Sequence, residues 1–192
     1  MRKIIVLNRV SIDGYFASLN DQTFGMDWFV PDPEVDAIVH EGGAADTLLM
    51  GAITYRGFER SWVPMLNDPN TPPPLRAVAE ELTHMRKVVF STQLKSSDIH
   101  WANTELHAGQ PAAVAARLKD EPGADMLIFG SGSIIRQLLP AGLIDELLLI
   151  VTPVVAGAGK SFFQQAPQTS LALLRAQSFK SGNVVLRYAV KR

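Results

Sequence analysis

The sequence contains no cysteine. Disulfide bonds, thiolate metal sites and cysteine nucleophiles are therefore excluded, and this composition fits a reducing compartment. A long hydrophobic run is also missing, because the apolar stretch Ile4–Leu7 behind Arg2 and Lys3 is far shorter than the roughly 7–15 residues of a signal-peptide core. We therefore expect a cytoplasmic protein without a membrane segment.

The chain has almost no excess of charge of one sign, since 18 basic and 19 acidic residues leave a formal net charge of −1. This balance creates no long-range field for phosphate backbones or anionic lipids, so neither nucleic acid nor a membrane surface is expected as a partner. The histidines show no metal-ligand spacing, and no metal site is predicted. Apolar residues make up 47% of the 192 residues, which suits one compact globular domain over residues 1–192.

Short apolar runs with β-branched residues alternate along the chain with stretches of helical spacing. The predicted strands are Ile4–Leu7, Thr47–Met50, Lys87–Phe90, Met126–Phe129 and Leu147–Val151. The predicted helices are Pro33–Ala44, Thr54–Trp62, Leu75–His84, Pro111–Lys119 and Ser133–Ala141. This alternation favours an α/β fold with a largely parallel sheet and helices on both faces. Leu171–Phe179 and Val184–Val190, separated by the turn residues Ser181–Asn183, predict an antiparallel hairpin at the sheet edge.

The turn Gly130-Ser131-Gly132-Ser133 lies between a predicted buried strand and a predicted helix. Glycines let backbone N–H groups approach an anion, and a helix amino terminus favours negative charge, so this turn is a candidate phosphate cradle. A plain glycine turn with Ser133 as the helix cap explains the same residues equally well. The turn is not a Rossmann fingerprint, because Ile135 replaces the third glycine.

Two further strand ends carry glycine or hydroxyl residues, at Gly51–Thr54 and at Ser91–Thr92. Because the carboxyl ends of parallel strands meet at one edge of a sheet, the three junctions are expected to converge there. Ala158–Ser161 looks like the end of a Walker A loop, but Val154 replaces the required first glycine and no helix opening follows. Nucleotide hydrolysis is therefore not predicted.

In these and other stretches the chain resembles the dihydrofolate-reductase-like superfamily, and within it the C-terminal reductase domain of the bifunctional riboflavin-biosynthesis deaminase-reductase and its stand-alone relatives. The stretches are Ser11–Tyr15, Leu49–Tyr55, Phe129–Gly132, Leu143–Lys160 and Val184–Tyr188. The resemblance implies a three-layer dihydrofolate-reductase-like fold, a homodimer, and a reductase that passes a hydride from NADPH to a small heterocycle. The apolar stretch Leu143–Val155 is a candidate for the dimer interface, unless it is buried inside the monomer.

The resemblance also implies where NADPH would bind. Gly51 and Thr54 would lie against the pyrophosphate, and Ser91 and Thr92 beside the adenosine 2′-phosphate. Gly130, Ser131, Gly132 and Ser133 would surround the other phosphates, and the nicotinamide would lie against backbone at Val10, Phe16 and Ala17. Many relatives have an arginine where this chain has Ala52, and Arg56 or Arg60 would compensate only if the helix turned them inward.

On the substrate side, the candidate catalytic residues are Asp13, Asp32 and Asp36, and the candidate substrate-binding residues are Trp28 and Thr152. Dihydrofolate reductases bind the pterin with a carboxylate in the stretch comparable to Asp32 and Asp36. Asp32 before Pro33 reads equally well as a helix cap, and Asp36 as part of a solvated helix face. Asp13 before Gly14 is either turn chemistry or, if buried, a proton donor.

The resemblance therefore predicts a reductase acting on a pterin-like or pyrimidine-like substrate. Two alternatives remain open: authentic dihydrofolate reductase activity, and a non-catalytic dimeric module that binds a nucleotide or a pterin. In the second alternative the phosphate-contacting glycines are required, but Asp13 and Asp36 are dispensable. No basic residue stands out as a partner for the glutamate tail of folate, which disfavours the first alternative.

Overall fold

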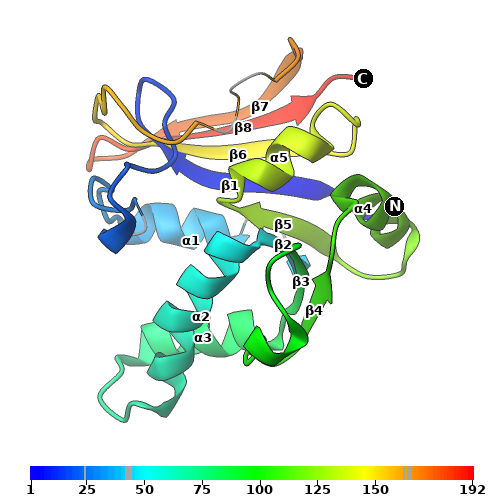
Figure 1. Ribbon diagram of the computed structural model, residues 1–192. Coiled ribbons are helices and arrows are strands. Elements are labelled where there is room, and N and C mark those ends of the chain that lie inside the picture. Colours follow the sequence, from blue (N-terminus) through cyan, green and yellow to red (C-terminus); the bar gives the residue numbers. More distant parts are fainter. Residues whose placement is uncertain (24, 42–44, 162, 164–165) are drawn as a thin grey trace.

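The computed structural model describes residues 1–23, 25–41, 45–161, 163 and 166–192. In these residues one sheet has the strand order β4-β3-β2-β5-β1-β6-β8-β7 (Figure 1). The strands are β1 Ile4–Val10, β2 Ala45–Gly51, β3 Arg86–Phe90, β4 Thr104–His107, β5 Asp125–Phe129, β6 Glu146–Val151, β7 Leu171–Ser178 and β8 Val184–Val190. The pairs among β1 to β6 are parallel, whereas β8 pairs antiparallel with both β6 and β7. The predicted mixed, mostly parallel sheet with a C-terminal hairpin is confirmed.

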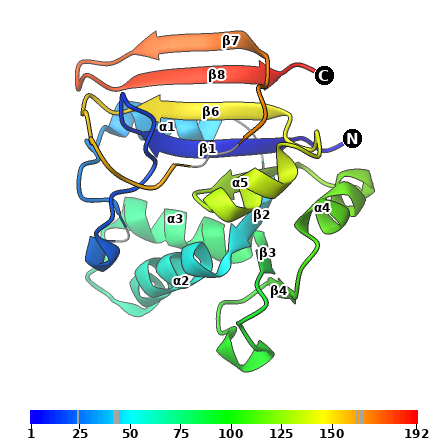
Figure 2. The ribbon, with the colours of Figure 1, turned by 45° about the horizontal axis from the view of Figure 1, so that its top comes forward.

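Helices cover both faces of this sheet and complete three layers (Figure 2). The α-helices are α1 Pro33–Glu41, α2 Ala52–Asn67, α3 Pro73–His84, α4 Pro111–Asp120 and α5 Gly132–Leu138, and short 3-10 helices cover Asp21–Thr23 and Ser96–Asp98. Side chains alternate between the faces of a strand. In β1, Ile4 and Val6 therefore join the core under α4 and α5, whereas Ile5 and Leu7 join the core under α1. A third cluster fills the space between β2, β3 and the helices α2 and α3.

Several element boundaries differ from the sequence predictions. Residues 42–44, with which the first predicted helix ends, lie outside the described residues, as do 162, 164 and 165 after the Walker-like stretch. Helix α2 begins at Ala52, directly after β2, and continues past the predicted end at Trp62 through Pro64. Strand β4 was not predicted, because Thr-Glu-Leu-His has no apolar run.

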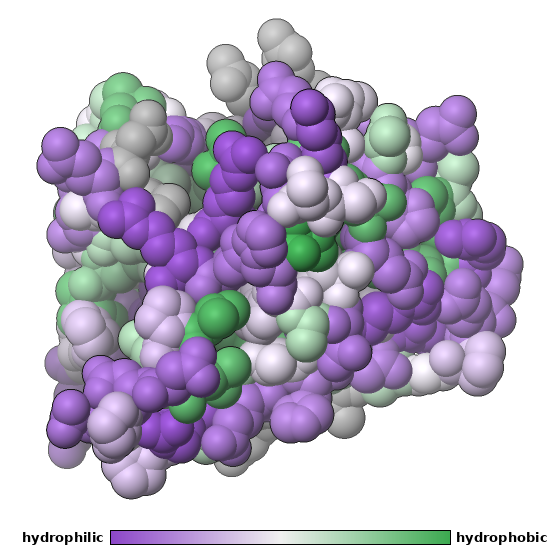
Figure 3. Space-filling view, turned by 60° about the horizontal axis from the view of Figure 1, so that its bottom comes forward, coloured by the Kyte–Doolittle hydropathy of each residue, from purple (hydrophilic) through white to green (hydrophobic). Residues whose placement is uncertain are grey.

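Strand β6 lies inside the sheet between β1 and β8, and most of its residues are buried within the chain. Of the two interpretations of Leu143–Val155, burial inside the monomer therefore holds for the strand itself. The face that carries α2 and α3 is largely hydrophilic, with apolar side chains in small separate groups (Figure 3). That face offers no broad apolar surface to a partner, and the homodimer stays a prediction.

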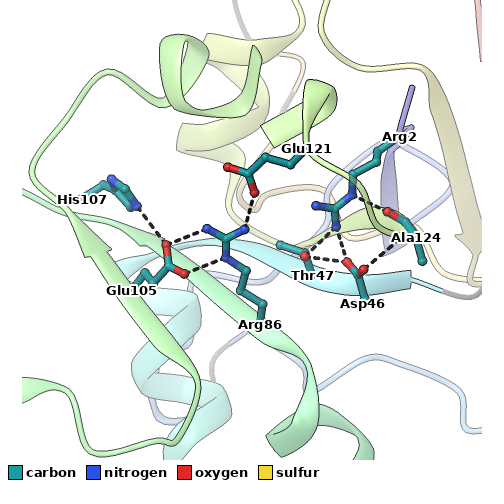
Figure 4. Close-up of polar contacts among 8 residues, drawn as sticks. All are labelled: Arg2, Asp46, Thr47, Arg86, Glu105, His107, Glu121 and Ala124. Atoms are coloured by element: carbon teal, nitrogen blue, oxygen red, sulfur yellow. Dashed lines mark hydrogen bonds and ion pairs between the residues drawn. The ribbon is translucent and has the colours of Figure 1, made fainter. Parts of the chain in front are cut away.

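The amino-terminal edge of the parallel strands is closed by ion pairs (Figure 4). Arg2, just before β1, pairs with Asp46 at the start of β2. Arg86 at the start of β3 lies 2.7 Å from carboxylate oxygens of both Glu105 and Glu121. These ion pairs hold the amino-terminal ends of the strands together. Since the charges neutralise one another, they are not available to a ligand, and the candidate ligand site is the opposite, carboxyl-terminal edge.

Candidate functional site

Two of the three predicted junctions meet at the carboxyl edge through one hydroxyl group. Ser131 follows β5, and its Oγ accepts the backbone N–H of Gly51 at 2.8 Å. The same oxygen donates to Thr54 Oγ1, also at 2.8 Å, in the first turn of α2. The turn after β5 and the start of the helix after β2 are therefore held against each other, although they are about eighty residues apart in the sequence.

Backbone conformation at this turn is unusual for a residue with a side chain. Gly130 has φ 54° and Ser131 has φ 58°, both in the left-handed region. A serine pays for this conformation in strain, and such strain gathers where a structure positions functional groups. The Gly130 N–H is fixed by Asn8 Oδ1 of β1 at 3.0 Å, so the adjacent central strand contributes directly to the turn.

Asn8 was missed in the sequence analysis, although a lone amide within the buried strand β1 is itself a signal. Its side chain is buried, and its Nδ2 has no hydrogen-bond partner among the described residues. Buried polar atoms almost always have a partner, so an unpaired donor beside a glycine turn indicates a ligand acceptor at this position.

Glycines also keep the junctions close together. A Cβ on Gly51 would lie 3.2 Å from Ser133 Oγ, and a Cβ on Gly132 would lie 3.2 Å from a ring carbon of Phe16. The loop after β1, which carries Phe16, therefore reaches the start of α5. Phe16 and Gly132, two of the predicted cofactor-binding residues, are thus brought together, with the Phe16 ring next to the glycine.

The third junction, which follows β3, lies beside the junction that follows β2. Gly51 pairs with Phe90 in the register of β2 and β3, so Ser91 and Thr92 follow at the same edge. Ser91 Oγ accepts the backbone N–H groups of Gln93 and Leu94 at 3.1 and 3.0 Å, which fixes the turn, while Thr92 is exposed. The three junctions thus lie along one edge, as the sequence predicts.

The loop after β1 is paired with the loop after β6. Ala17 and Lys160 form an antiparallel bridge, in which the Lys160 N–H donates to the Ala17 carbonyl at 2.7 Å. Val10 at the end of β1 is buried, and its carbonyl accepts the N–H of Thr152 at 2.7 Å. The two loops form one unit over the ends of the central strands.

The Asp13 side chain connects the two loops, and we call this connection the latch. Its two carboxylate oxygens accept the backbone N–H groups of Ala156 at 3.0 Å and Gly157 at 2.8 Å. A hydrogen bond from the Ser11 hydroxyl, followed by the bond from Ala156, lowers the pKa of Asp13 to about 2. The side chain is exposed, so the burial that a proton donor at Asp13 would need is not met, and hydrogen bonds to the charged form keep this carboxylate ionised.

Replacing Asp13 with asparagine is expected to loosen the loop after β6, because an amide has one acceptor oxygen where the carboxylate has two. Hydrogen exchange of the Ala156 and Gly157 amides should accelerate, while the melting temperature changes little. In the unmodified protein the latch is fully present above pH 3.8 and is lost as the pH falls through about 2. Asp27→Asn is the matched control, because Asp27 is also an exposed aspartate and its carboxylate accepts hydrogen bonds from the hydroxyl groups of Ser18 and Thr23 rather than from the loop after β6. Equal exchange rates in the two variants would contradict the latch.

Asp32 and Asp36 lie on the other face of the sheet, at the start of α1. Asp32 Oδ1 accepts the N–H groups of Glu34 at 2.9 Å and Val35 at 3.4 Å, so it caps the helix as the alternative interpretation predicts. The Ser181 hydroxyl donates to its other oxygen and is the main reason that the pKa of Asp32 is lowered. Asp36 is half exposed and pairs with Arg9 at 2.6 Å.

The two predicted substrate residues differ in exposure. Thr152 is fully buried at the end of β6, whereas Trp28 is half-buried on the loop before α1, edge to face with Phe29 at 5.0 Å. Asp13 is bound to the loop after β6, whereas Asp32 is bound to the start of α1 and to Ser181, and Asp36 to Arg9. The proposed catalytic carboxylates therefore do not form one cluster.

The chain is similar in sequence and in fold to known proteins. The family model of the RibD C-terminal domain matches residues 2–186, nearly the whole chain. The chain belongs to the RibD C-terminal domain family. An uncharacterized Bacillus subtilis protein, YyaP, is 29% identical over 190 residues, which cover 97% of this chain and 94% of YyaP.

Solved structures agree with the RibD C-terminal assignment at the level of the fold. A putative riboflavin biosynthesis protein from Shewanella superposes with a TM-score of 0.69 at 21% identity, covering 100% of both chains. A dihydrofolate reductase from Enterococcus faecalis, solved with NADP(H), superposes with a TM-score of 0.61 at 14% identity, covering 99% of this chain and 97% of the reductase. The chain therefore has a dihydrofolate-reductase-like fold.

Two features that would point to other functions are missing from the described residues of this RibD C-terminal domain. Within those ranges, no group of three or more histidine or acidic side chains is placed to hold a metal ion. None of the helices in the described part of the chain is both long and apolar enough to span a membrane.

Proposed function

We propose that this protein is an NADPH-dependent reductase that transfers a hydride to a small heterocyclic substrate of the pterin or pyrimidine type. The observation that carries the proposal is the bond network of Ser131, which joins Gly51 and Thr54 of one junction to the glycine turn of another. Membership of the RibD C-terminal family supports the same reaction class.

The residues at this edge fit a dinucleotide. The N–H groups of Gly51 and Gly130 are bound by Ser131 Oγ and Asn8 Oδ1, and both residues lack the Cβ that would stand against Ser133 or Thr54, so the strand ends and the hydroxyl side chains lie close together. The unpaired Asn8 Nδ2 supplies a donor for a phosphate or carboxamide oxygen. Helix α2 runs for sixteen residues from Ala52, so its amino terminus adds a partial positive charge.

NADPH, when bound, supplies the hydride. The chain contributes position: the paired loops after β1 and β6 cover the strand ends and limit access of water, and the junctions orient the cofactor. The lowered pKa values of Asp13 and Asp32 favour their ionised forms at neutral pH, so neither carboxyl is poised as a proton reservoir. Asp36, the third candidate, is paired with Arg9, so the proton that completes the reduction is assigned to solvent.

The preference for NADPH over NADH is inferred from the family. Ala52 has no charge for the 2′-phosphate, and Arg56 and Arg60 on the following turns of α2 are exposed. Exposed guanidinium groups can still meet a phosphate at the surface, and we assign this contact to Arg56, one turn after Ala52.

The test is a titration of the purified protein with NADPH and with NADH, followed by the fluorescence of the reduced nicotinamide. Saturable binding of both is expected, with the lower dissociation constant for NADPH. Arg56→Ala should bring the NADPH constant close to that of NADH and leave the NADH constant unchanged. If neither cofactor binds, the reductase hypothesis is rejected, and the alternative of a non-catalytic binding module remains.

A further inference from the structure

Two buried polar side chains face each other across β6 and β8, at the carboxyl end of β6. The antiparallel register pairs Val151 with Val184, so the next pair is Thr152 with Asn183. Leu148 and Ile150 of β6 pack in the cluster under α1, and alternation places Thr152 on the same face. Directly opposite side chains in such a ladder lie about 5 Å apart at Cβ.

Both side chains are fully buried and incompletely paired. Thr152 and Asn183 have 0% exposure. Within the described residues, Thr152 Oγ1 and Asn183 Oδ1 find no hydrogen-bond partner. Burying a hydroxyl and an amide oxygen without partners costs free energy, so two such atoms side by side call for an explanation in terms of a bound group.

The orientation of the Asn183 amide is fixed by its own contacts. Nδ2 donates to the Val30 carbonyl at 3.1 Å and to Ser181 Oγ at 3.0 Å, which uses both amide hydrogens. Turning the amide over would place its oxygen against the Val30 carbonyl, two acceptors in contact. Asn183 Oδ1 is therefore an acceptor without a donor among the described residues, and the Thr152 hydroxyl is available as a donor.

The surroundings of the pair carry charges that are already neutralised. Arg9 donates to the Val30 carbonyl at 3.3 Å, so it lies close to Asn183, but its charge is paired with Asp36. Asp32 is held by Ser181 and by the helix start. A ligand at Thr152 and Asn183 would therefore contact one neutral hydrogen-bond donor and one neutral acceptor, and no unpaired charge.

We propose that Thr152 and Asn183 together recognise a cyclic amide edge of the substrate, a ring N–H next to a ring C=O. The N–H donates to Asn183 Oδ1, and the C=O accepts from the Thr152 hydroxyl. The inference rests on the proposed function, because the ligand is taken to be the substrate of the reductase. The substrate ring then lies on the α1 side of β1, and the cofactor junctions lie on the β5 side. The segment that carries Trp28 and Val30 contacts Asn183 and has to shift to admit the ring.

The experiment uses lumazine, a flat pteridinedione with a ring N–H between two carbonyls, as the probe. Its binding to the whole protein is followed by its fluorescence, with and without saturating NADP⁺. Methylation of both ring nitrogens, which removes every N–H next to a carbonyl, should weaken binding at least tenfold, whereas methylation of either ring nitrogen alone, which leaves one such N–H, should weaken it less. Equal binding of lumazine and its dimethylated form, or no binding of lumazine to the unmodified protein in either condition, overturns the proposal.

Thr152→Val tests the hydroxyl with almost no change of shape. Lumazine binding should weaken at least tenfold, and Thr152→Ser should restore it. The melting temperature of Thr152→Val should be unchanged or higher, because the variant removes an unpaired buried hydroxyl. A lower melting temperature with unchanged lumazine affinity would mean that the hydroxyl binds a structural water only, and would overturn the proposal. NADPH binding, measured on the same samples, reports separately on the proposed function.

Discussion

Replacing Gly132 with aspartate is expected to abolish measurable NADPH binding while the protein stays folded. The residue is the first of α5 and follows the strained Gly130-Ser131 turn, where a cofactor phosphate would lie. A carboxylate within about 4 Å of a phosphate near a protein surface costs about 4 kcal/mol, which is roughly a 1,000-fold loss of affinity. The nicotinamide fluorescence titration measures this loss directly.

The fold is expected to tolerate this change. A Cβ at Gly132 would meet Arg136 Nη1 and a Phe16 ring carbon, both at 3.2 Å and both near the ends of side chains that can turn. An aspartate in the first turn of a helix, four residues before an arginine, is also locally favourable. The melting temperature should therefore stay close to that of the unmodified protein.

Gly132→Asn is the matched control, since asparagine has nearly the same size as aspartate and no charge. It should weaken NADPH binding by less than about tenfold, because only the steric part of the effect remains. If the aspartate and asparagine variants bind NADPH equally well, no phosphate lies at the start of α5, and the position of the cofactor site is wrong.

The sheet and the convergence of the three junctions were predictable because they depend on local patterns. Short β-branched runs define β1, β2, β3, β5 and β6, and parallel strands bring their carboxyl ends to one edge whatever fills the loops. Strand β4 escaped prediction because a half-exposed edge strand needs no apolar run. Helix α2 continues past Trp62 because it packs on α3 and tolerates Pro64 near its end.

The roles of individual polar residues were much harder to predict, because they depend on contacts between distant segments. Asp13 binds N–H groups some 143 residues away, and nothing in Asp-Gly distinguishes that latch from an ordinary turn. Asn183 lies in a stretch, Ser-Gly-Asn, that reads as turn chemistry alone. Its buried amide becomes informative only when the register places it opposite Thr152.

Lys87 is the clearest case of a residue whose sequence context hides its role. It belongs to a run that predicts a buried strand, and the structure does bury it completely, with 0% exposure. Its Nζ donates to the carbonyls of Leu82 and Thr83 at 2.8 Å and of Met85 at 2.7 Å, at the carboxyl end of α3. It also lies 4.5 Å above the Trp101 ring.

This arrangement keeps a cation in the core at the negative end of a helix. Burial lowers the pKa of Lys87 to about 8, because desolvation disfavours the charged form. The three carbonyl groups and the ring act in the opposite direction, since each interacts best with the ammonium. The lysine thus serves as the cap that joins α3 to β3.

Lys87→Met is expected to lower the free energy of unfolding by about 3 kcal/mol, because the buried helix carbonyls lose a charged donor while the volume of the side chain is kept. For a chain of this size that loss corresponds to a fall in melting temperature of roughly 6–12 °C, measurable by circular dichroism. Lys191→Met, at an exposed position near the carboxyl terminus, should leave the melting temperature unchanged within about 2 °C. Because Lys87 lies toward the amino-terminal edge of β3, away from the glycine junctions, NADPH affinity below the melting transition should be the same in both variants. A stable Lys87→Met protein would show that the α3 carbonyls are satisfied without the ammonium, and the assignment of Lys87 as a helix cap would then be withdrawn.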